Sequence, residues 1–264
     1  MTFDAQAFNT HRLSFGHVAE HYDRARPTYP AEAVTWAVGP EPGRVLDLGA
    51  GTGKLTRVAV DLGLEVVAVE PDPGMRAQFD AATPGLTARG EVSLGGPGER
   101  RSRRDSSLRA LAGSAEEIPL PDASVDAVIV GQAYHWFDRD KALPEIARVL
   151  RPGGKFAPIW NTRSVEEGWT KQLDEIMDSD RDKRWWSRVK DPDFGSLFGP
   201  IEDRVFHHTV VYTRERLRDM VTSRSHFLVA PPERQADVLA RLDALPGDVF
   251  EMPYSTLVRK AFKR

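Results

Sequence analysis

The sequence predicts an α/β protein in which helices cover both faces of an open, mostly parallel β-sheet. Three observations support this fold class. Largely apolar runs at residues 45–48 and 65–70, and a third within the turn and fourth strand predicted over 122–130, are typical of strands that are buried on both faces. Segments with a helical spacing of apolar residues separate these runs, which is the order of a parallel sheet. A chain of 264 residues can also bury a core without a disulfide, and this chain has no cysteine.

The composition excludes several classes of protein. With 36 Lys and Arg against 39 Asp and Glu, the net charge of −3 gives no general attraction to nucleic acid or to an anionic membrane. No apolar run approaches the ~18 residues of a membrane helix, and the N-terminus lacks the apolar core of a signal peptide. We therefore expect a cytoplasmic protein, a monomer or weak dimer, whose partner is a small-molecule substrate rather than nucleic acid or a membrane.

The fold is organised around VLDLGAGTGKLT, residues 45–56. An apolar strand there ends at a turn with three glycines, Gly49, Gly51 and Gly53, and a helix over 54–62 follows. Such a turn places backbone N–H groups and the positive end of the helix beside a bound ligand. Glycine is needed because a side chain would block the turn or the close approach.

The spacing of this turn separates three classes of ligand. A phosphate-binding P-loop needs G-x-x-x-x-G-K-[ST], but Leu48 stands at the first glycine position and Leu55 at the Ser/Thr position. The dinucleotide fingerprint G-x-G-x-x-G is broken by Lys54. What remains is D-x-G-x-G-x-G, which begins at Asp47. A carboxylate at that point repels a pyrophosphate and suits a positively charged ligand such as S-adenosylmethionine.

Residues 47–53 resemble motif I of class I S-adenosylmethionine-dependent methyltransferases. Residues 15–154 resemble the small-molecule branch that includes the type 11 group and trans-aconitate methyltransferase. The resemblance implies a Rossmann-like sheet of seven mostly parallel strands, the last antiparallel, with a small helical cap. It also implies a single domain over 1–264, with the cofactor-binding core at 15–160 and the cap helices and last strands at 161–264.

The segment YDRARPTYP, residues 22–30, resembles the N-terminal segment of this family, which lies across the cofactor mouth. The resemblance implies that Tyr22 and Arg26 bind the cofactor, with Arg26 on its methionine carboxylate or on an acidic substrate, and that Tyr29 lines the substrate pocket. The alternative is a surface turn set by the prolines. Just upstream, HVAEH at 17–21 formally fits a zinc-peptidase pattern, but no downstream acidic ligand is identified, so we expect no metal.

The second strand, 65–70, ends in Glu70, which lies 23 residues after Asp47 (70 − 47). This is close to the spacing of a carboxylate that binds the ribose hydroxyls of a nucleoside at the next strand's tip. The alternative is that Glu70 only caps the following turn. By resemblance, Met75 in that turn lies near the adenine.

The third strand is predicted at 86–88 or, preferably, at 108–111, which leads directly into the next motif. Between these alternatives, the Gly, Ser and Arg content of residues 90–107 predicts a disordered surface insert. The motif GSAEEIPLP at 113–121 resembles the stretch that surrounds the edge of the adenine in this family. The resemblance assigns three of its residues to the cofactor: Ser114, Ala115 and Glu116.

The stretch GQAYHWFD, residues 131–138, follows the fourth strand at the sheet edge where open α/β sheets bind ligands. It resembles the QAFHWF stretch of the family. We expect Gln132, His135 and Trp136 to face the transfer site, with Gln132 also touching the cofactor. With a reference pKa of about 6.5, His135 is suited to accept a proton from a hydroxyl acceptor, whereas it would only position a carboxylate acceptor. The alternative is a buried turn whose aromatic residues only pack.

The fifth strand is predicted over 155–160, and Asn161 and Arg163 at its tip are expected to line the substrate pocket. The pattern predicts further elements around it, namely helices over 30–38, 138–150, 165–179, 213–221 and 231–245 and strands over 204–212 and 250–262.

These features together predict an S-adenosyl-L-methionine-dependent methyltransferase (EC 2.1.1.-) that O-methylates a carboxylate or hydroxyl of a small molecule. His135 and Gln132 are its predicted catalytic residues, and Arg26 and Arg163 point to an anionic substrate. The sulfonium already activates the methyl group, so the protein mainly aligns the acceptor and excludes water. Three alternatives stay open: an RNA methyltransferase, an NAD(P)-linked oxidoreductase, and a protein that binds the cofactor without turnover.

Overall fold

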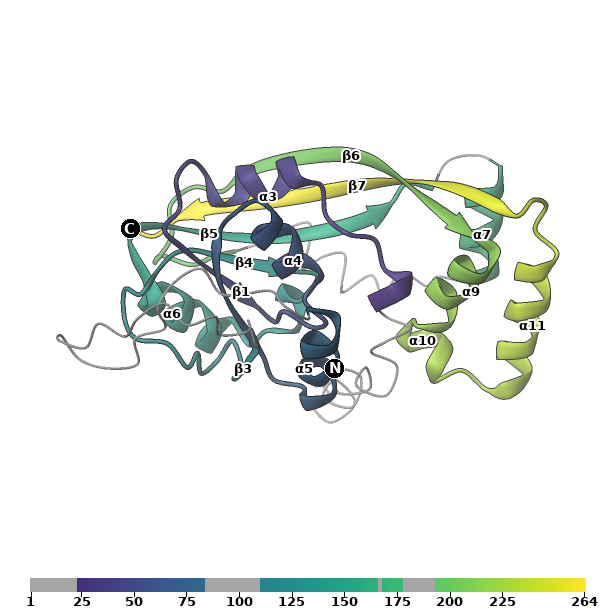
Figure 1. Cartoon of the computed structure of the whole chain (residues 1–264), viewed down its shortest axis with the longest axis horizontal. Helices are drawn as coiled ribbons and strands as arrows, with labels where there is room; N and C mark the ends of the chain where they lie inside the picture. The colour runs from purple at the N-terminus through teal and green to yellow at the C-terminus, as the bar shows by residue number, and fades with distance from the viewer. Residues whose placement is uncertain (1–22, 84–109, 166–167, 178–192) are drawn as a thin grey trace.

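The structure is a computed structural model that describes residues 23–83, 110–165, 168–177 and 193–264 (Figure 1). Tyr22, the 17–21 histidine pattern, the strand alternative at 86–88 and the insert predicted at 90–107 lie outside the described residues. Within them, strands and helices alternate through the first half of the chain as the sequence predicts.

Seven strands form one sheet in the order β3-β2-β1-β4-β5-β7-β6. The strands are β1 (Arg44–Leu48), β2 (Glu65–Glu70), β3 (Ala110–Ala112), β4 (Val125–Gly131), β5 (Leu150–Arg163), β6 (Glu202–Thr213) and β7 (Val249–Phe262). The last strand, β7, lies between β5 and β6 and is antiparallel to both, whereas the pairs from β3 to β5 are parallel. The predicted Rossmann-like α/β fold, with seven mostly parallel strands and the last antiparallel, is therefore confirmed.

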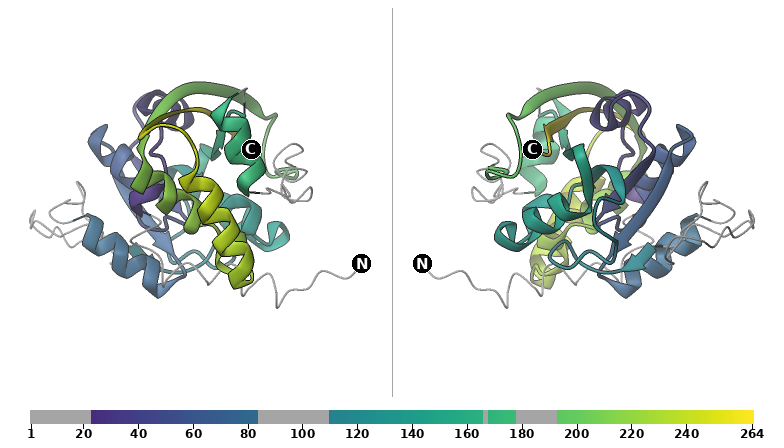
Figure 2. Two further views of the ribbon diagram at one scale, coloured as in Figure 1. Left: turned by 90° about the vertical axis from the view of Figure 1, so that its right-hand side faces the viewer. Right: turned by 90° about the vertical axis from the view of Figure 1, so that its left-hand side faces the viewer.

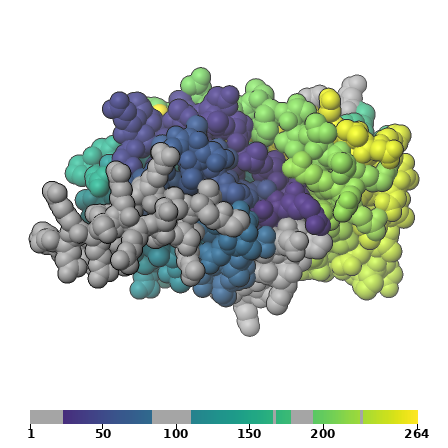
Figure 3. All heavy atoms as spheres, viewed as in Figure 1, coloured from purple at the N-terminus to yellow at the C-terminus, as the bar shows by residue number. Residues whose placement is uncertain are grey.

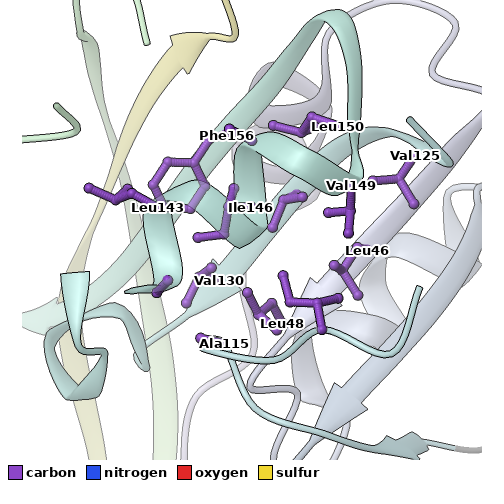
Figure 4. Close-up of a cluster of buried hydrophobic side chains, with 14 of the residues drawn as sticks. Leu46, Leu48, Ala115, Val125, Val130, Leu143, Ile146, Val149, Leu150 and Phe156 are labelled. Atoms are coloured by element: carbon purple, nitrogen blue, oxygen red, sulfur yellow. The ribbon is translucent and has the colours of Figure 1, made fainter. Parts of the chain in front are cut away.

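Helices cover both faces of this sheet. They are α3 (Ala31–Val38), α4 (Lys54–Asp61), α5 (Pro73–Ala82), α6 (Arg139–Val149), α7 (Trp169–Met177), α9 (Arg214–Thr222), α10 (Ser225–Leu228) and α11 (Pro232–Asp243). Successive strand residues point to opposite faces, so Leu46 and Leu48 of β1 pack with Ile146 of α6 (Figure 4), while Val45 packs with Val34 of α3. This is why the central residues of β2 and β4, 66–69 and 127–130, are all apolar.

The helical cap lies beyond the carboxyl ends of the parallel strands. The long strands β6 and β7 extend past the rest of the sheet, and α7, α9 and α11 pack on this extension around Tyr212, Met252 and Tyr254 (Figures 1 and 2). Trp169 of α7 packs on Phe250, with ring centroids 5.1 Å apart, as a core residue of the cap. None of the described helices has both the length and the apolar character needed to span a membrane.

Several element boundaries differ from those predicted. The fifth strand has 14 residues instead of the predicted 155–160, because pairing with the long β7 continues it as far as Arg163. The third strand, predicted over 108–111, occupies Ala110–Ala112 in the described residues and ends one residue later than predicted. The cap helix predicted over 165–179 is the shorter α7 in the described residues. The four-residue α10 is too short to show a helical period in the sequence and was not predicted.

Candidate active site

Three strand ends meet at one edge of the sheet. The strands β1, β2 and β4 are parallel neighbours, with Asp47 in register with Ala68 of β2 and Ile129 of β4. Their carboxyl ends therefore lie side by side. The glycine turn follows β1, Glu70 ends β2 and Gln132 follows β4, so the structure brings together the three stretches from which the sequence predicted a site.

The glycine turn is closed on one side and open on the other. The φ angles of Gly49, Gly51 and Gly53 are positive, at 72°, 56° and 83°. Residues other than glycine rarely adopt this region of backbone conformation. A Cβ on Gly53 would lie 2.7 Å from the ring of Phe79, whereas a Cβ on Gly51 would meet no heavy atom of the described residues within 4 Å. The backbone at Gly51 is thus open to the close approach of a ligand.

Glu70 fixes this turn with its carboxylate. Its Oε2 accepts the N–H of Gly51 at 2.9 Å and its Oε1 accepts the N–H of Asp72 at 2.9 Å. Burial raises the pKa of Glu70, although these two hydrogen bonds act in the opposite direction. Each oxygen keeps a further lone pair, so the capping contacts leave acceptors for ribose hydroxyls. Met75, whose N–H donates to Asp72 Oδ1 at 3.0 Å, is buried in the next turn.

Asp47 lies fully buried beneath the turn. Its Oδ2 accepts the hydroxyl of Thr56 at 2.6 Å, while its Oδ1 has no hydrogen-bond partner among the described residues. Burial raises the pKa of Asp47 to about 7; the Thr56 hydrogen bond opposes this effect and the nearby charge of Glu70 adds to it. A buried acceptor without a donor is unfavourable, so this carboxylate is suited to a ligand that brings a cationic donor.

The residues assigned to the adenine lie beside Glu70, which is in register with the last residue of β3. The Oγ of Ser114 accepts the N–H of Glu116 at 3.3 Å, and the side chain of Ala115 is buried in the core. Glu116 Oε1 accepts the N–H of Asp138 at 3.0 Å, at the start of α6. The carboxylate of Glu116 therefore holds a helix start, a contact that the sequence did not predict.

Gln132 and His135 follow β4 in a tight turn. Gln132 has a positive φ of 56°, and its Nε2 donates to the backbone oxygen of Asn161 at 2.7 Å. Strained backbone of this kind at a non-glycine residue is concentrated at functional sites. The 3₁₀-helix η2 (Tyr134–Trp136) comes next, and in it the His135 ring packs on Trp136 with centroids 4.8 Å apart.

Tyr134 anchors η2, a role that sequence reasoning missed. Its side chain is fully buried, and burial raises the pKa of its hydroxyl to about 12. Its ring makes edge contacts with four other aromatic rings, with centroids 5.4 to 6.3 Å apart: Phe137, Phe156, Trp160 and Phe194. The aromatic character of the AYHWF stretch was the available signal, but it does not show which ring is the anchor.

The segment before α3 is fixed across the glycine turn. Oδ1 of Asp23 accepts the hydroxyl of Thr52 and Nη2 of Arg57, both at 2.6 Å. Nδ2 of Asn161 donates to the backbone oxygen of Thr28 at 3.0 Å. Figure 3 shows this segment at the surface between the sheet domain and the cap. Asp23 and Thr28 were not among the predicted residues, because their partners are distant in the sequence.

Tyr29 and Asn161, both predicted to bind substrate, are largely engaged with the protein. Tyr29 is buried in the core next to α3, and a Cβ on Gly131 would lie 2.7 Å from its hydroxyl oxygen. Besides the contact with Thr28, Oδ1 of Asn161 accepts the hydroxyl of Thr256 at 2.6 Å. Both residues thus hold the 26–30 segment against the sheet, and any contact with substrate remains a prediction.

Arg163 is placed at the entrance of the cap. Only 9% of its side chain is exposed, and its Nη2 lies 3.3 Å from Oδ1 of Asp174 in α7. Its register partner on β7 is Tyr254, whose side chain is buried in the cap. In the described ranges, no group of three or more His, Asp or Glu side chains is arranged to hold a metal ion.

Comparisons with known proteins agree with this fold and with a methyltransferase. A family model for a methyltransferase domain matches residues 46–157. An uncharacterized methyltransferase of Mycobacterium tuberculosis is 42% identical over 233 residues, which cover 88% of this chain and 85% of that protein. A malonyl-[acyl-carrier protein] O-methyltransferase of Methylococcus capsulatus is 35% identical over 153 residues, which cover 55% of this chain and 49% of that protein.

The fold similarity extends over nearly the whole chain. A solved structure from Anaeromyxobacter dehalogenans, provisionally assigned as a type II methyltransferase, gives a TM-score of 0.58 at 23% identity and covers 90% of this chain and 97% of that one. The sheet order and the glycine turn define an α/β fold of the nucleotide-binding type. The chain belongs to the class I S-adenosylmethionine-dependent methyltransferases.

Proposed function

We propose that this chain transfers the methyl group of S-adenosylmethionine to an oxygen of a small molecule, either a carboxylate or a hydroxyl. The observation that carries the proposal is the pair of acidic side chains, Asp47 and Glu70, that end neighbouring strands beneath an open glycine turn. Two carboxylates at this place favour a cationic nucleoside and disfavour a pyrophosphate.

The residues present fit this cofactor. Oδ1 of Asp47 is a buried acceptor that lacks a donor among the described residues, and the space beside Gly51 is open. We assign the ammonium group of the cofactor to Asp47 and its ribose hydroxyls to Glu70. The other residues assigned to the cofactor surround this centre or belong to the adjoining N-terminal segment: Gly49, Gly53, Met75, Ser114, Ala115, Glu116, Gln132, Arg26 and, outside the described residues, Tyr22.

When bound, S-adenosylmethionine supplies a methyl carbon that its positively charged sulfur has already activated. The task of the chain is to hold the acceptor oxygen in line with that carbon and to exclude water. Tyr134 anchors η2, so His135 and Trp136 are held at the end of β4 next to Gln132. With a hydroxyl acceptor, His135 would accept the proton that the reacting hydroxyl loses. A carboxylate acceptor releases no proton, and His135 then only positions it.

The charge of the acceptor is supported by two observations. The Methylococcus relative is, by its name, an O-methyltransferase of malonyl-[acyl-carrier protein], whose malonyl group carries a carboxylate. The net charge of −3 does not favour a polyanionic partner. The net charge argues against a nucleic-acid partner. We further propose that the acceptor is a small molecule bound by Tyr29, His135, Trp136, Asn161 and Arg163, and that the protein is a monomer or weak dimer.

Calorimetric titration with S-adenosylhomocysteine tests the cofactor assignment. We expect Asp47→Ala and Glu70→Ala each to weaken binding at least tenfold, because each removes a hydrogen-bonded, charged acceptor. The exposed Asp61→Ala, at the end of α4, is the matched control and should bind like the wild type. Unchanged affinity in both site variants would remove the assignment. Methylated product from a panel of carboxylic acids and alcohols, detected by mass spectrometry, then separates an enzyme from a protein that only binds.

A further inference from the structure

Arg224, which follows helix α9, is a partly buried cation that the proposed transfer site does not explain. Its Nε is buried with no hydrogen-bond partner among the described residues, and its Nη2 lies 3.7 Å from Sδ of Met220. None of the described carboxylates pairs with it. A guanidinium group stays protonated in proteins, so this burial is unfavourable unless a negative charge joins it.

Two further arginines act on the same region. Burial lowers the pKa of Arg224, and the positive charges of Arg26 and Arg163 lower it further. Arg26 comes from the N-terminal segment, Arg163 from the end of β5 and Arg224 from the cap, so the fold brings together residues that are far apart in the sequence. Asp174 offsets one of these charges, through its 3.3 Å contact with Arg163.

Two tyrosine hydroxyls adjoin the three arginines. Tyr254 of β7 is in register with Arg163, and its hydroxyl lies 3.0 Å from that of Tyr212. Burial raises the pKa of Tyr212, and the contact with Tyr254 adds to this effect, so Tyr212 keeps its proton. Guanidinium and phenol groups are both donors to oxyanions, and charged hydrogen bonds of this kind are among the strong ones.

The arginines lie a short distance from the proposed transfer site. Arg163 is two residues beyond Asn161, whose backbone oxygen accepts the hydrogen bond from Gln132. Two residues of a strand span about 7 Å. A small molecule can therefore place its reacting oxygen next to Gln132 while a second group, about 7 Å away, reaches the arginines.

We propose that the methyl acceptor carries a second, anionic group, a carboxylate or a phosphate, which Arg163 and Arg224 bind with the hydroxyl of Tyr254. This inference rests on the proposed function and specifies its substrate class. Arg26, at the cofactor side of the three arginines, contributes positive charge to the same region. The partly buried positive charge of Arg224 thus serves substrate binding rather than folding. In the free protein this charge lowers the free energy of unfolding.

Thermal unfolding of the full chain saturated with S-adenosylhomocysteine tests this site. Sodium malonate and sodium phosphate are titrated separately at an ionic strength kept constant with NaCl, and the arm that saturates identifies the type of anion. In the wild type we expect a saturable rise in Tm. Arg224→Met should remove this rise, weaken apparent anion binding at least tenfold and raise the Tm of the anion-free protein, because it replaces a buried charge with an apolar side chain of similar length.

The control variant is Arg218→Met on the preceding helix α9, at an exposed residue that pairs with Asp243 at 2.9 Å. It should keep the anion response of the wild type. The inference is overturned if neither anion gives a saturable rise, if Arg224→Met keeps the rise, or if Arg224→Met lowers Tm in the absence of anion, which would make the guanidinium a structural group. Binding of S-adenosylhomocysteine is measured first and should be unchanged in Arg224→Met. If the wild type does not bind S-adenosylhomocysteine, the proposed function is refuted instead.

Discussion

Cofactor affinity should depend on pH through Asp47. Its pKa is raised from 3.8 to about 7, mainly by burial. The folded protein therefore disfavours the ionised form of Asp47 by about 4 kcal/mol relative to the unfolded chain. The charge of the neighbouring Glu70, whose own pKa is raised by burial, adds to the shift of Asp47. A cationic ligand prefers the ionised carboxylate, and its binding therefore has to compete with protonation of Asp47 below pH 7.

The direction of the effect on stability follows from the same shift. Because the folded-state pKa is higher than the unfolded one, the neutral carboxyl stabilises the folded protein below pH 3.8, and this contribution is lost as the pH rises through about 7. The ligand-free protein should thus lose stability from pH 4 to pH 7.5, by about 4 kcal/mol if Asp47 acts alone. Urea unfolding at the two pH values, in the wild type and in Asp47→Asn, measures this difference.

The binding assay is calorimetric titration with S-adenosylhomocysteine between pH 5.5 and 7.5. With a pKa of about 7, the dissociation constant should be about 25-fold higher at pH 5.5 than at pH 7.5. Asp47→Asn should bind weakly with little dependence on pH. A flat profile in the wild type would refute the contact between Asp47 and the cofactor. An equal slope in Asp47→Asn would show that a different group titrates.

Three further predictions concern the glycine turn, the N-terminal segment and η2. Gly51→Ala should lower the free energy of unfolding by about 1–2 kcal/mol because of its positive φ, and it should reduce affinity for S-adenosylhomocysteine more than tenfold. Gly53→Ala should destabilise the protein by ~1–3 kcal/mol more than Gly51→Ala in urea unfolding, because its Cβ meets the ring of Phe79. Asp23→Asn should speed release of S-adenosylhomocysteine about three- to tenfold in stopped-flow experiments, since Thr52 and Arg57 lose a charged acceptor. An unchanged rate would show that the segment before α3 does not cover the cofactor. Tyr134→Phe should change unfolding by less than about 1 kcal/mol and Tyr134→Ala by about 3–5 kcal/mol; equal effects would place its stabilising role in the hydroxyl rather than in the ring.

Local patterns in the sequence were sufficient to predict the fold class and the centre of the candidate site. The apolar runs of β1, β2 and β4 and the glycine spacing at 49–53 each lie within a few residues, so their structural consequence does not depend on distant partners. Parallel pairing then brings their carboxyl ends together, which is why Asp47, Glu70 and Gln132 could be predicted as neighbours. The assignments of these residues to the cofactor and to catalysis stay predictions.

Tertiary structure decided how the side chains around this centre are used. The carboxylate of Glu116 binds the start of α6, and Asp23 fixes the N-terminal segment to Thr52 and Arg57; neither contact has a local signal. The sequence alone could not show that the charge of Arg26 acts on Arg224, 198 residues away (224 − 26), because β6 and β7 first have to carry the cap to the sheet edge. Burial and charge are properties of the assembled fold, whereas strands and turns are encoded within a few neighbouring residues.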